Sequence, residues 1–324
     1  MTHPYDTLTP VTVLDMIEAL GFELQGEPFA LNSYENRVYA WRAESGSRFV
    51  LKVYRPGRWT AQQIDEELSF LDWLEQHQVP AGRVWTSPEG VRRHEFKGFH
   101  YALFHAVPGQ APELDNPAHL FALGELMGRM HAAAADFSFV HRPTLEPMPL
   151  LERSREQVLL CGRLDKGQRR TYERLTSELL TQAEQWSLSG LRLLPTHGDC
   201  HIGNLLGRDD EFSLVDFDDA ITAPAINDLW MWLSGEDAQQ WQRQWSEIIE
   251  GYEQYRAFDS RELEWIERLR TLRLVRHTAW IIERWNDPAF PSAFSWLERP
   301  GYWETHLRTL EQQRHALSSP HWLA

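Results

Sequence analysis

The chain carries "HGDCHIGN" at residues 197–204 and "LVDFDD" at residues 214–219. The first stretch places Asp199 in a His-Gly-Asp turn, with Asn204 closing the motif. The second stretch is an apolar run that ends at Asp216. Asp, Asn and Gly are poor formers of helix and strand interiors, so folding alone does not explain this pattern. We interpret the two stretches as parts of one chemical site.

The chemistry of these stretches admits three readings. Two carboxylates and an amide oxygen, on a loop and at a strand end, are hard ligands suited to a Mg²⁺ ion that keeps positions for water or phosphate. A zinc site at His197, Cys200 and His201 is less favoured, because no second Cys or His cluster lies nearby in the sequence to complete a tetrahedron. In the third reading, His197 and Asp199 only cap a turn.

Composition excludes several classes of partner. The 324 residues are 42% hydrophobic and 24% charged, with a formal net charge of −15, which is typical of a folded globular protein. A surface this acidic repels phosphate backbones and anionic lipids, so we expect no nucleic-acid and no membrane partner. Two cysteines and no predicted secretory signal or membrane span favour the reducing cytoplasm.

The sequence predicts an α+β fold with two lobes. Residues 1–105 hold β-runs "RVYAWRA" and "RFVLKVY" joined by a Ser-Gly turn, a helix from Thr60, and the strand "GFHYALFH". Residues 106–112 contain Pro-Gly and form the expected hinge. Residues 113–324 are mostly long helical patterns, with 136–170 linking two of them and a hairpin turning at Asp209-Asp210. We therefore expect a small antiparallel-sheet lobe and a larger helical lobe.

Lys52 lies among apolar residues in the second β-run, so its ammonium group needs a partner if the strand is buried. A solvent-exposed lysine at a strand edge is the alternative. The following helix offers both Glu66 and Glu67. Glu67 lies between Ile64 and Leu71 on the apolar stripe, so it is predicted to face inward and to pair with Lys52.

The motif resembles that of a known superfamily. HxDxxxxN followed by an Asp at a strand end is similar to the protein-kinase catalytic loop and its metal-binding Asp. The form HGDxHxGN and then VDFDD resembles the aminoglycoside-phosphotransferase and choline-kinase branch. The stretches "LNSYENRVY", "KVYRPGRWTAQQI", "HGDCHIGNLL", "DLWMWL" and "WNDPAFP" resemble the bacterial stress response kinase A family of Ser/Thr protein kinases, from about residue 8 to 316. This resemblance implies a two-lobed protein-kinase-like fold.

The resemblance also implies roles for individual residues. Asp199 corresponds to the catalytic base, and Asn204 and Asp216 correspond to the Mg²⁺ ligands. Asp216 thus belongs to both the catalytic and the metal set. Lys52 corresponds to the strand lysine that contacts the α- and β-phosphates of ATP.

The nucleotide loop departs from the protein-kinase pattern, because no G-x-G-x-x-G is present. "LNSYENRV" occupies its place, and family analogy makes Ser33 and Asn36 the expected contacts to nucleotide. Three further carboxylates keep open roles. Asp218 and Asp219 either support the metal or are solvated, and Asp228 either braces the catalytic loop or is a helix N-terminal charge.

We expect an ATP- and Mg²⁺-dependent kinase that phosphorylates protein Ser/Thr hydroxyls, a cytoplasmic monomer acting in a stress response, with autophosphorylation at a site left open. A small-molecule kinase for an amino alcohol, sugar or aminoglycoside is the first alternative, and a non-catalytic kinase-like binding protein is the second. An arginine-rich stretch either forms a basic surface that attracts an acidic polypeptide or pairs with the excess of Glu and Asp; its members are Arg142, Arg153, Arg155, Arg163, Arg169 and Arg170.

Overall fold

The two predicted β-runs form adjacent antiparallel strands, β2 (Arg37–Arg42) and β3 (Arg48–Val53). In the computed structural model, which describes residues 3–208, 210–235 and 237–320, they belong to a five-stranded sheet of order β1-β2-β3-β5-β4. The other strands of this sheet are β1 (Phe29–Ala30), β4 (Arg93–Phe96) and β5 (Phe99–His105).

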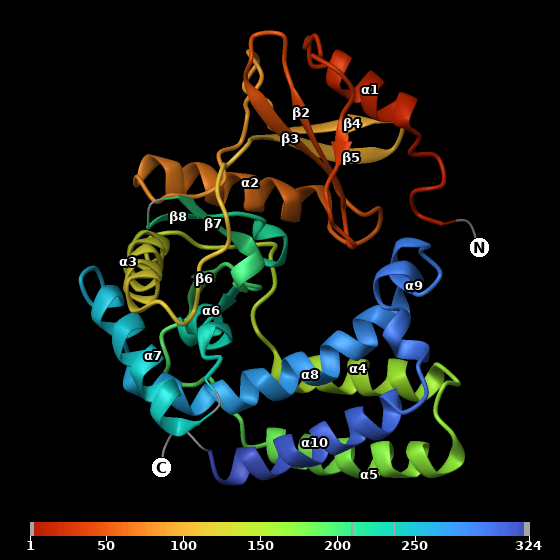
Figure 1. Cartoon of the computed structure of the whole chain (residues 1–324), viewed down its shortest axis with the longest axis vertical. Coiled ribbons are helices and arrows are strands. Elements are labelled where there is room, and N and C mark those ends of the chain that lie inside the picture. The colour runs from red at the N-terminus through yellow and green to blue at the C-terminus, as the bar shows by residue number, and fades with distance from the viewer. Residues whose placement is uncertain (1–2, 209, 236, 321–324) are drawn as a thin grey trace. The chain divides into compact units, whose positions relative to one another are not determined.

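The alternation of side chains along β3 gives the sheet two different faces. Leu51 and Val53 are fully buried in a core that includes Met16 and Ile17 of helix α1 (Pro10–Glu18). Lys52 therefore points to the opposite face. Helix α2 (Ala61–Gln76) crosses that face of the sheet (Figure 1).

Helix α2 is fixed in place by its cap and by its apolar stripe. Thr60 and Gln63 form a reciprocal capping box, with hydrogen bonds of 3.0 and 3.3 Å. The buried residues recur at helical spacing and include one charged side chain; they are Ile64, Glu67, Leu68, Phe70, Leu71 and Leu74. The predicted inward direction of Glu67 follows from this stripe.

The chain divides into two compact units. The first comprises the chain up to Pro143 together with Leu194–Ala223 and Ser246–Phe258. Besides the sheet it contains α3 (Pro117–Ala134), the strand pair β6 (Leu194–Thr196) and β9 (Ile221–Ala223), the hairpin β7 (Leu205–Arg208) and β8 (Glu211–Leu214), and the end of α7 (Ala238–Tyr252). The hairpin turn holds Asp210 as expected, while Asp209 lies outside the described residues.

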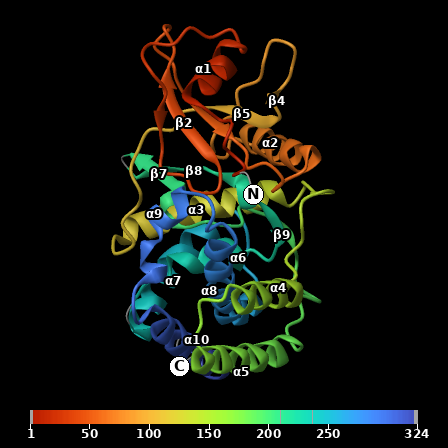
Figure 2. The same cartoon turned by 90° about the vertical axis from the view of Figure 1, so that its right-hand side faces the viewer.

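The second unit is helical. Within it α4 packs against α8 and α5 packs against α10, as Figures 1 and 2 show. Its helices are α4 (Pro147–Leu160), α5 (Lys166–Ala183), α6 (Ile226–Leu229), α8 (Trp265–Glu283), α9 (Ala289–Ala293) and α10 (Tyr302–Ser318). The expectation that residues 136–170 form a linker between two helices is wrong in part, because this segment contains α4. Pro147 and Pro149 mask this helix in the sequence, but Pro is well tolerated in a first helical turn.

The predicted α+β class is confirmed: an antiparallel sheet near the N-terminus is followed by a mostly helical remainder. The lobe boundaries at 105 and 113 stay predictions. Within the part of the chain that the structure describes, no helix combines the length and apolar character needed to span a membrane.

Candidate active site

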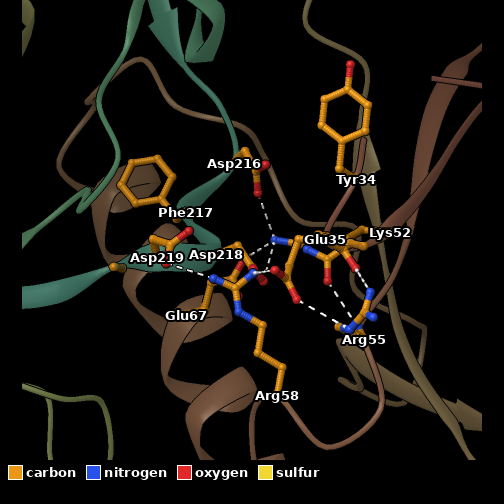
Figure 3. Close-up of polar contacts among 12 residues, drawn as sticks. Tyr34, Glu35, Lys52, Arg55, Arg58, Glu67, Asp216, Phe217, Asp218 and Asp219 are labelled. Carbon is orange, nitrogen blue, oxygen red and sulfur yellow. Dashed lines mark hydrogen bonds and ion pairs between the residues drawn. The ribbon is translucent and has the colours of Figure 1, made fainter. Parts of the chain in front are cut away.

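Lys52 is the centre of a buried ionic cluster in the first unit. Its side chain is 6% exposed, and its Nζ lies 2.9 Å from Glu67 Oε1, 3.0 Å from Asp216 Oδ1 and 3.1 Å from Asp218 Oδ1. Figure 3 shows the three carboxylates approaching Nζ from different directions. Lys52 donates hydrogen bonds to Glu67 and Asp216, and its contact with Asp218 is an ion pair.

The electrostatics of this cluster follow from burial and pairing. Burial alone would lower the pKa of Lys52, but Asp216, Asp218 and Glu67 raise that pKa well above its ordinary value. Burial raises the pKa of Glu67 against the opposing effects of Lys52 and Arg142. The sequence reading that a lysine on this strand requires a partner agrees with the contact, and Glu67 rather than Glu66 supplies it.

The turn that carries Asp199 is held to the segment after β8, which carries Asp216. His197 is fully buried, and its Nε2 lies 2.9 Å from the carbonyl oxygen of Val215. Asn204 Nδ2 donates to the Asp199 carbonyl oxygen at 2.9 Å, and the Val215 N–H donates to the Asn204 carbonyl oxygen at 2.9 Å. These bonds fix the backbone around both predicted functional carboxylates.

Gly198 permits a close backbone approach inside this turn. Its φ is +88°, and a Cβ built there would lie 1.9 Å from the Asp219 carbonyl oxygen. Both the left-handed φ and the missing side chain are properties of glycine. The His-Gly-Asp turn and the segment after Asp216 therefore touch backbone to backbone. Asp216 itself has a left-handed conformation, with φ 63° and ψ 71°.

Asp218 and Asp219 are paired rather than freely solvated. Asp218 is 3% exposed, and Arg58 binds it through Nη1 at 2.5 Å and binds Asp219 through Nη2 at 2.7 Å. Arg58 also lies 3.7 Å from Glu35 in the loop before β2 (Figure 3). Although burial would raise the pKa of Asp218, Arg58 and Lys52 lower it below its ordinary value.

The sequence reading missed Arg58 and left the role of Arg142 open. Arg58 stands in the "RPGRWT" stretch, which was quoted only for its family resemblance. A basic surface that includes Arg142 is wrong, because its side chain is buried against Glu67. Two other members of the arginine-rich stretch are paired, since Arg163 contacts Glu298 and Arg169 contacts Glu173.

The expected nucleotide loop lies between β1 and β2. Ser33 is half-buried there, whereas Asn36 is 2% exposed. Asn36 Oδ1 accepts the backbone N–H of Arg55 at 3.0 Å, which ties the loop to the segment that precedes α2. Tyr34 points away from the ionic cluster (Figure 3).

The donor chemistry fits a partly coordinated Mg²⁺ better than zinc. Asp216 offers a carboxylate that is 46% exposed, and Asn204 offers an amide oxygen from a segment hydrogen-bonded to Val215. Cys200 is fully buried, and the His197 ring is committed to Val215. Across residues 3–208, 210–235 and 237–320, no three His, Cys, Asp or Glu side chains converge as a metal cluster.

Asp228, whose role the sequence leaves open, lies in the second unit, which is helical. Asp228 is fully buried on α6, and its Oδ1 lies 3.4 Å from Asn227 Nδ2. It is therefore more than a solvated charge at a helix N-terminus.

Comparison with known proteins agrees with this geometry. Residues 27–266 match the model of the phosphotransferase enzyme family. The stress response kinase A of Escherichia coli strain K12 is 39% identical over 317 residues, covering 98% of this chain and 95% of that protein. The serine/threonine protein kinase RdoA of Salmonella typhimurium strain LT2 is 38% identical with the same coverage.

Solved structures show the same fold at lower identity. Amicoumacin kinase in complex with AMP-PNP, Ca²⁺ and amicoumacin has a TM-score of 0.72 at 22% identity, covering 94% of this chain and 92% of that chain. A microcompartment-associated aminopropanol kinase has a TM-score of 0.70 at 17% identity, covering 96% and 99%. By family match and by identity along nearly its whole length, the chain belongs to the phosphotransferase enzyme family and, within it, to the stress response kinase A family.

Proposed function

We propose that this phosphotransferase uses ATP and Mg²⁺ to phosphorylate Ser and Thr hydroxyls of proteins. The observation that carries the proposal is the Lys52 cluster, which lies in the same unit as the turn bearing Asp199. The protein acceptor is supported by the similarity to relatives named stress response kinase A and serine/threonine protein kinase.

Nucleotide binding is assigned to the face of the sheet that bears Lys52. Lys52 donates hydrogen bonds to Glu67 and Asp216 and forms an ion pair with Asp218, so a phosphate oxygen would compete with these carboxylates for the ammonium group. Asp216 is the most exposed of the three and the one to be displaced. Ser33 would contact the phosphates, while Asn36 holds the loop against Arg55.

Asn204 and Asp216 would hold the metal ion. When bound, Mg²⁺ neutralises charge on the nucleotide phosphates. The Asn204 amide nitrogen already donates to the Asp199 carbonyl oxygen, so the amide oxygen is the atom that the ion would take. The Asp216 carboxylate, which is paired with Lys52 in this structure, would be the second protein ligand.

Asp199 is assigned as the base that orients the acceptor. Its side chain is 30% exposed, and its backbone is fixed by Asn204 and His197. The acceptor oxygen forms a bond to the γ-phosphorus while the bond from that phosphorus to the β–γ bridging oxygen breaks. The hydroxyl proton passes to Asp199, and ADP leaves with the bridging oxygen.

The acceptor class is tested with γ-labelled ATP and Mg²⁺. Purified protein is incubated with a general protein acceptor and separately with choline-like, sugar and aminoglycoside alcohols. Label in protein supports the proposal. Label confined to one of the small alcohols would establish the small-molecule alternative, and no transfer with nucleotide binding retained would establish a non-catalytic binding protein.

Asp199→Asn is expected to lower phosphoryl transfer by about 10²–10⁴-fold, because a positioned base contributes that much to rate. Nucleotide affinity in the presence of Mg²⁺ should stay near wild type. Asp165→Asn is the matched control, since Asp165 caps α5 and Asn caps a helix equally well. Full turnover by the Asp199 variant would remove it from the mechanism.

The cellular setting belongs to the same proposal. The family name supports a role in a stress response, and we propose a cytoplasmic location. We propose a monomer that also phosphorylates itself. Mass in solution by light scattering and phosphosite mapping after incubation with ATP test these two points.

A further inference from the structure

Arg142 lies in the segment between α3 and α4 and is buried, although no motif in the sequence singles it out for the site. Its guanidinium group donates to both sides of the ionic cluster. On the α2 side, Nη2 donates to Glu67 Oε2 at 2.9 Å, and Nε donates to the carbonyl oxygen of Gln63 at 2.9 Å. The group also lies 4.7 Å from the Trp59 ring centre.

On the other side, Arg142 binds the backbone that follows Asp216. Its Nη1 donates to the carbonyl oxygen of Asp218 at 2.8 Å and to that of Ala220 at 3.1 Å. One planar group therefore joins helix α2 to the turn that contains the predicted metal ligand. Lys cannot reproduce this, because a single ammonium lacks the planar fork of donors.

The backbone around Arg142 is held as firmly as its side chain. The Glu66 carboxylate accepts the backbone N–H groups of Val140 at 2.6 Å, His141 at 2.8 Å and Arg142 at 2.7 Å. Glu66 and Glu67 thus act on the same segment in different ways. Glu66 fixes the backbone, and Glu67 receives the side chain.

We propose that Arg142 is a positioning residue for phosphoryl transfer. It keeps Glu67 against Lys52 and fixes the backbone of residues 217–220, so that the helix and the metal-binding turn stay in register. This inference rests on the proposed function of Lys52 and Asp216. Arg142 itself touches no reacting atom.

The energetic reason is the burial of its partners. Glu67 is fully buried and has Lys52 on one oxygen and Arg142 on the other. Removing Arg142 takes this donor from that second oxygen and from the carbonyl oxygens of Gln63, Asp218 and Ala220, and a buried acceptor left unmatched is costly. The local structure is then expected to rearrange, and the contact between Glu67 and Lys52 with it.

The test compares Arg142→Met with Arg155→Met, in which a half-buried arginine of the second unit loses its bond to Thr176. Measured well below the melting temperature, the Arg142 variant should lose about 10- to 100-fold in kcat/KM, the effect of one charged hydrogen-bonding partner. The Arg155 variant should retain wild-type kinetics. Arg142→Lys keeps the positive charge but lacks the planar fork of guanidinium donors, so it should also lose activity. This variant replaces Arg142→Met in the test if the Met variant fails to fold.

Two readouts separate positioning from mere stabilisation. If Arg142 acts through Glu67, then Glu67→Gln combined with Arg142→Met should be no slower than the slower single variant. Affinity for AMP-PNP should fall further in Mg²⁺ than without it, because Lys52 would contact the phosphates in both cases, whereas residues 217–220 adjoin the proposed metal ligand Asp216. The inference would be overturned if the two substitutions lowered the rate independently in the double variant. It would also be overturned if the folded fraction of the Arg142→Met variant had wild-type kinetics.

The outcome for wild type keeps the two proposals apart. If wild type transfers no phosphate to any acceptor, the proposed function fails, while the metal-dependent affinity for AMP-PNP still tests Arg142. If wild type is active and both Arg142 variants match it in kcat/KM and in AMP-PNP affinity, only the inference about Arg142 fails.

Discussion

At the scale of single residues, the site is a set of charges that compensate one another. Lys52 and Arg58 share Asp218, and Glu67 is shared by Lys52 and Arg142. Such a network tolerates burial because each charge meets opposite charge within hydrogen-bonding distance. Removing one member therefore leaves its partners buried without their opposite charge. The expected effects on stability and on binding differ from member to member.

Asp216→Ala is expected to separate metal binding from nucleotide binding. Lys52 would lose one of its carboxylate partners and gain a free donor for phosphate, so affinity for metal-free nucleotide should be kept or should rise. The increase in affinity that Mg²⁺ brings should disappear. Calorimetric titration of AMP-PNP with and without Mg²⁺ measures both quantities. An unchanged metal effect would move the metal role to Asp218 or Asp219.

Asp218→Asn is expected to destabilise the protein by about 3 kcal/mol at neutral pH, because it leaves Arg58 and Lys52 short of one buried countercharge. The pKa of Asp218 is lowered in the folded protein, so its stabilising effect is present above its unfolded pKa of about 3.9 and is lost as pH falls through the folded value. Urea unfolding between neutral and acidic pH should show the difference between wild type and variant shrinking only in acid.

Asp115→Asn is the control for that measurement, since Asp115 is exposed just before α3 and lies outside the cluster. Its unfolding free energy should stay near wild type at neutral pH. A variant at Asp218 that is as stable as this control would show that the buried ion pairs contribute nothing net.

Sequence patterns reach some of these residues and not others. Glu67 is predictable because helical spacing places it on the apolar stripe of α2. Arg58 and Arg142 meet partners far along the chain, with 160 residues between Arg58 and Asp218 and 75 between Arg142 and Glu67. Pairing of that kind follows from tertiary packing and leaves no periodic signal.

At the scale of elements, periodicity and capping signals predict the main features. Helix α2 begins after its Thr60 cap, and β2 and β3 pair across the expected turn. Short elements are missed, because β1 has 2 residues and β6 and β9 have 3 each, which is too little for an alternating pattern. These short strands matter to the site, since β6 leads into the His-Gly-Asp turn.

Gly198→Ala is expected to cost about 3 kcal/mol of stability and most of the activity, because a Cβ would collide with the Asp219 carbonyl oxygen. Gly190→Ala is the matched control. Gly190 has a similar φ of +84°, but a Cβ there meets nothing within 4 Å. It should cost only about 1 kcal/mol for the left-handed conformation.

Thermal unfolding and phosphoryl transfer measured on both glycine variants distinguish strain from collision. Equal costs at the two positions would mean that backbone conformation alone explains Gly198. A larger cost at Gly198, with activity lost in molecules that remain folded, would show that the backbone contact positions the turn.

At the scale of the whole molecule, charge decides which acceptor is attracted. The net charge is −15, and three of the six arginines considered for a basic surface are buried or paired with carboxylates, namely Arg142, Arg163 and Arg169. The long-range field therefore favours a basic polypeptide over an acidic one. The sequence leaves two outcomes open for the arginine-rich stretch, a basic surface or pairing with acidic residues, and the contacts of Arg142, Arg163 and Arg169 favour pairing.

Two Ser-containing peptides that differ only in the sign of their flanking charges test this field. Transfer to the basic peptide should be faster at low salt and should slow as the Debye length shrinks from about 30 Å at 0.01 M to about 8 Å at 0.15 M. Transfer to the acidic peptide should change in the opposite direction. The reverse ranking would imply a local basic groove that outweighs the net charge.

The attachment of α2 has a consequence for regulation. In protein kinases, activation depends on bringing a lysine–glutamate pair together by moving the helix that bears the glutamate. Here that pair is formed, and Glu66 hydrogen-bonds the same helix to residues 140–142. Moving α2 away from Lys52 would break the Glu66 hydrogen bonds together with the pair, which makes an activation switch at this helix costly. We expect the cell to set its output through synthesis, turnover and the supply of substrate.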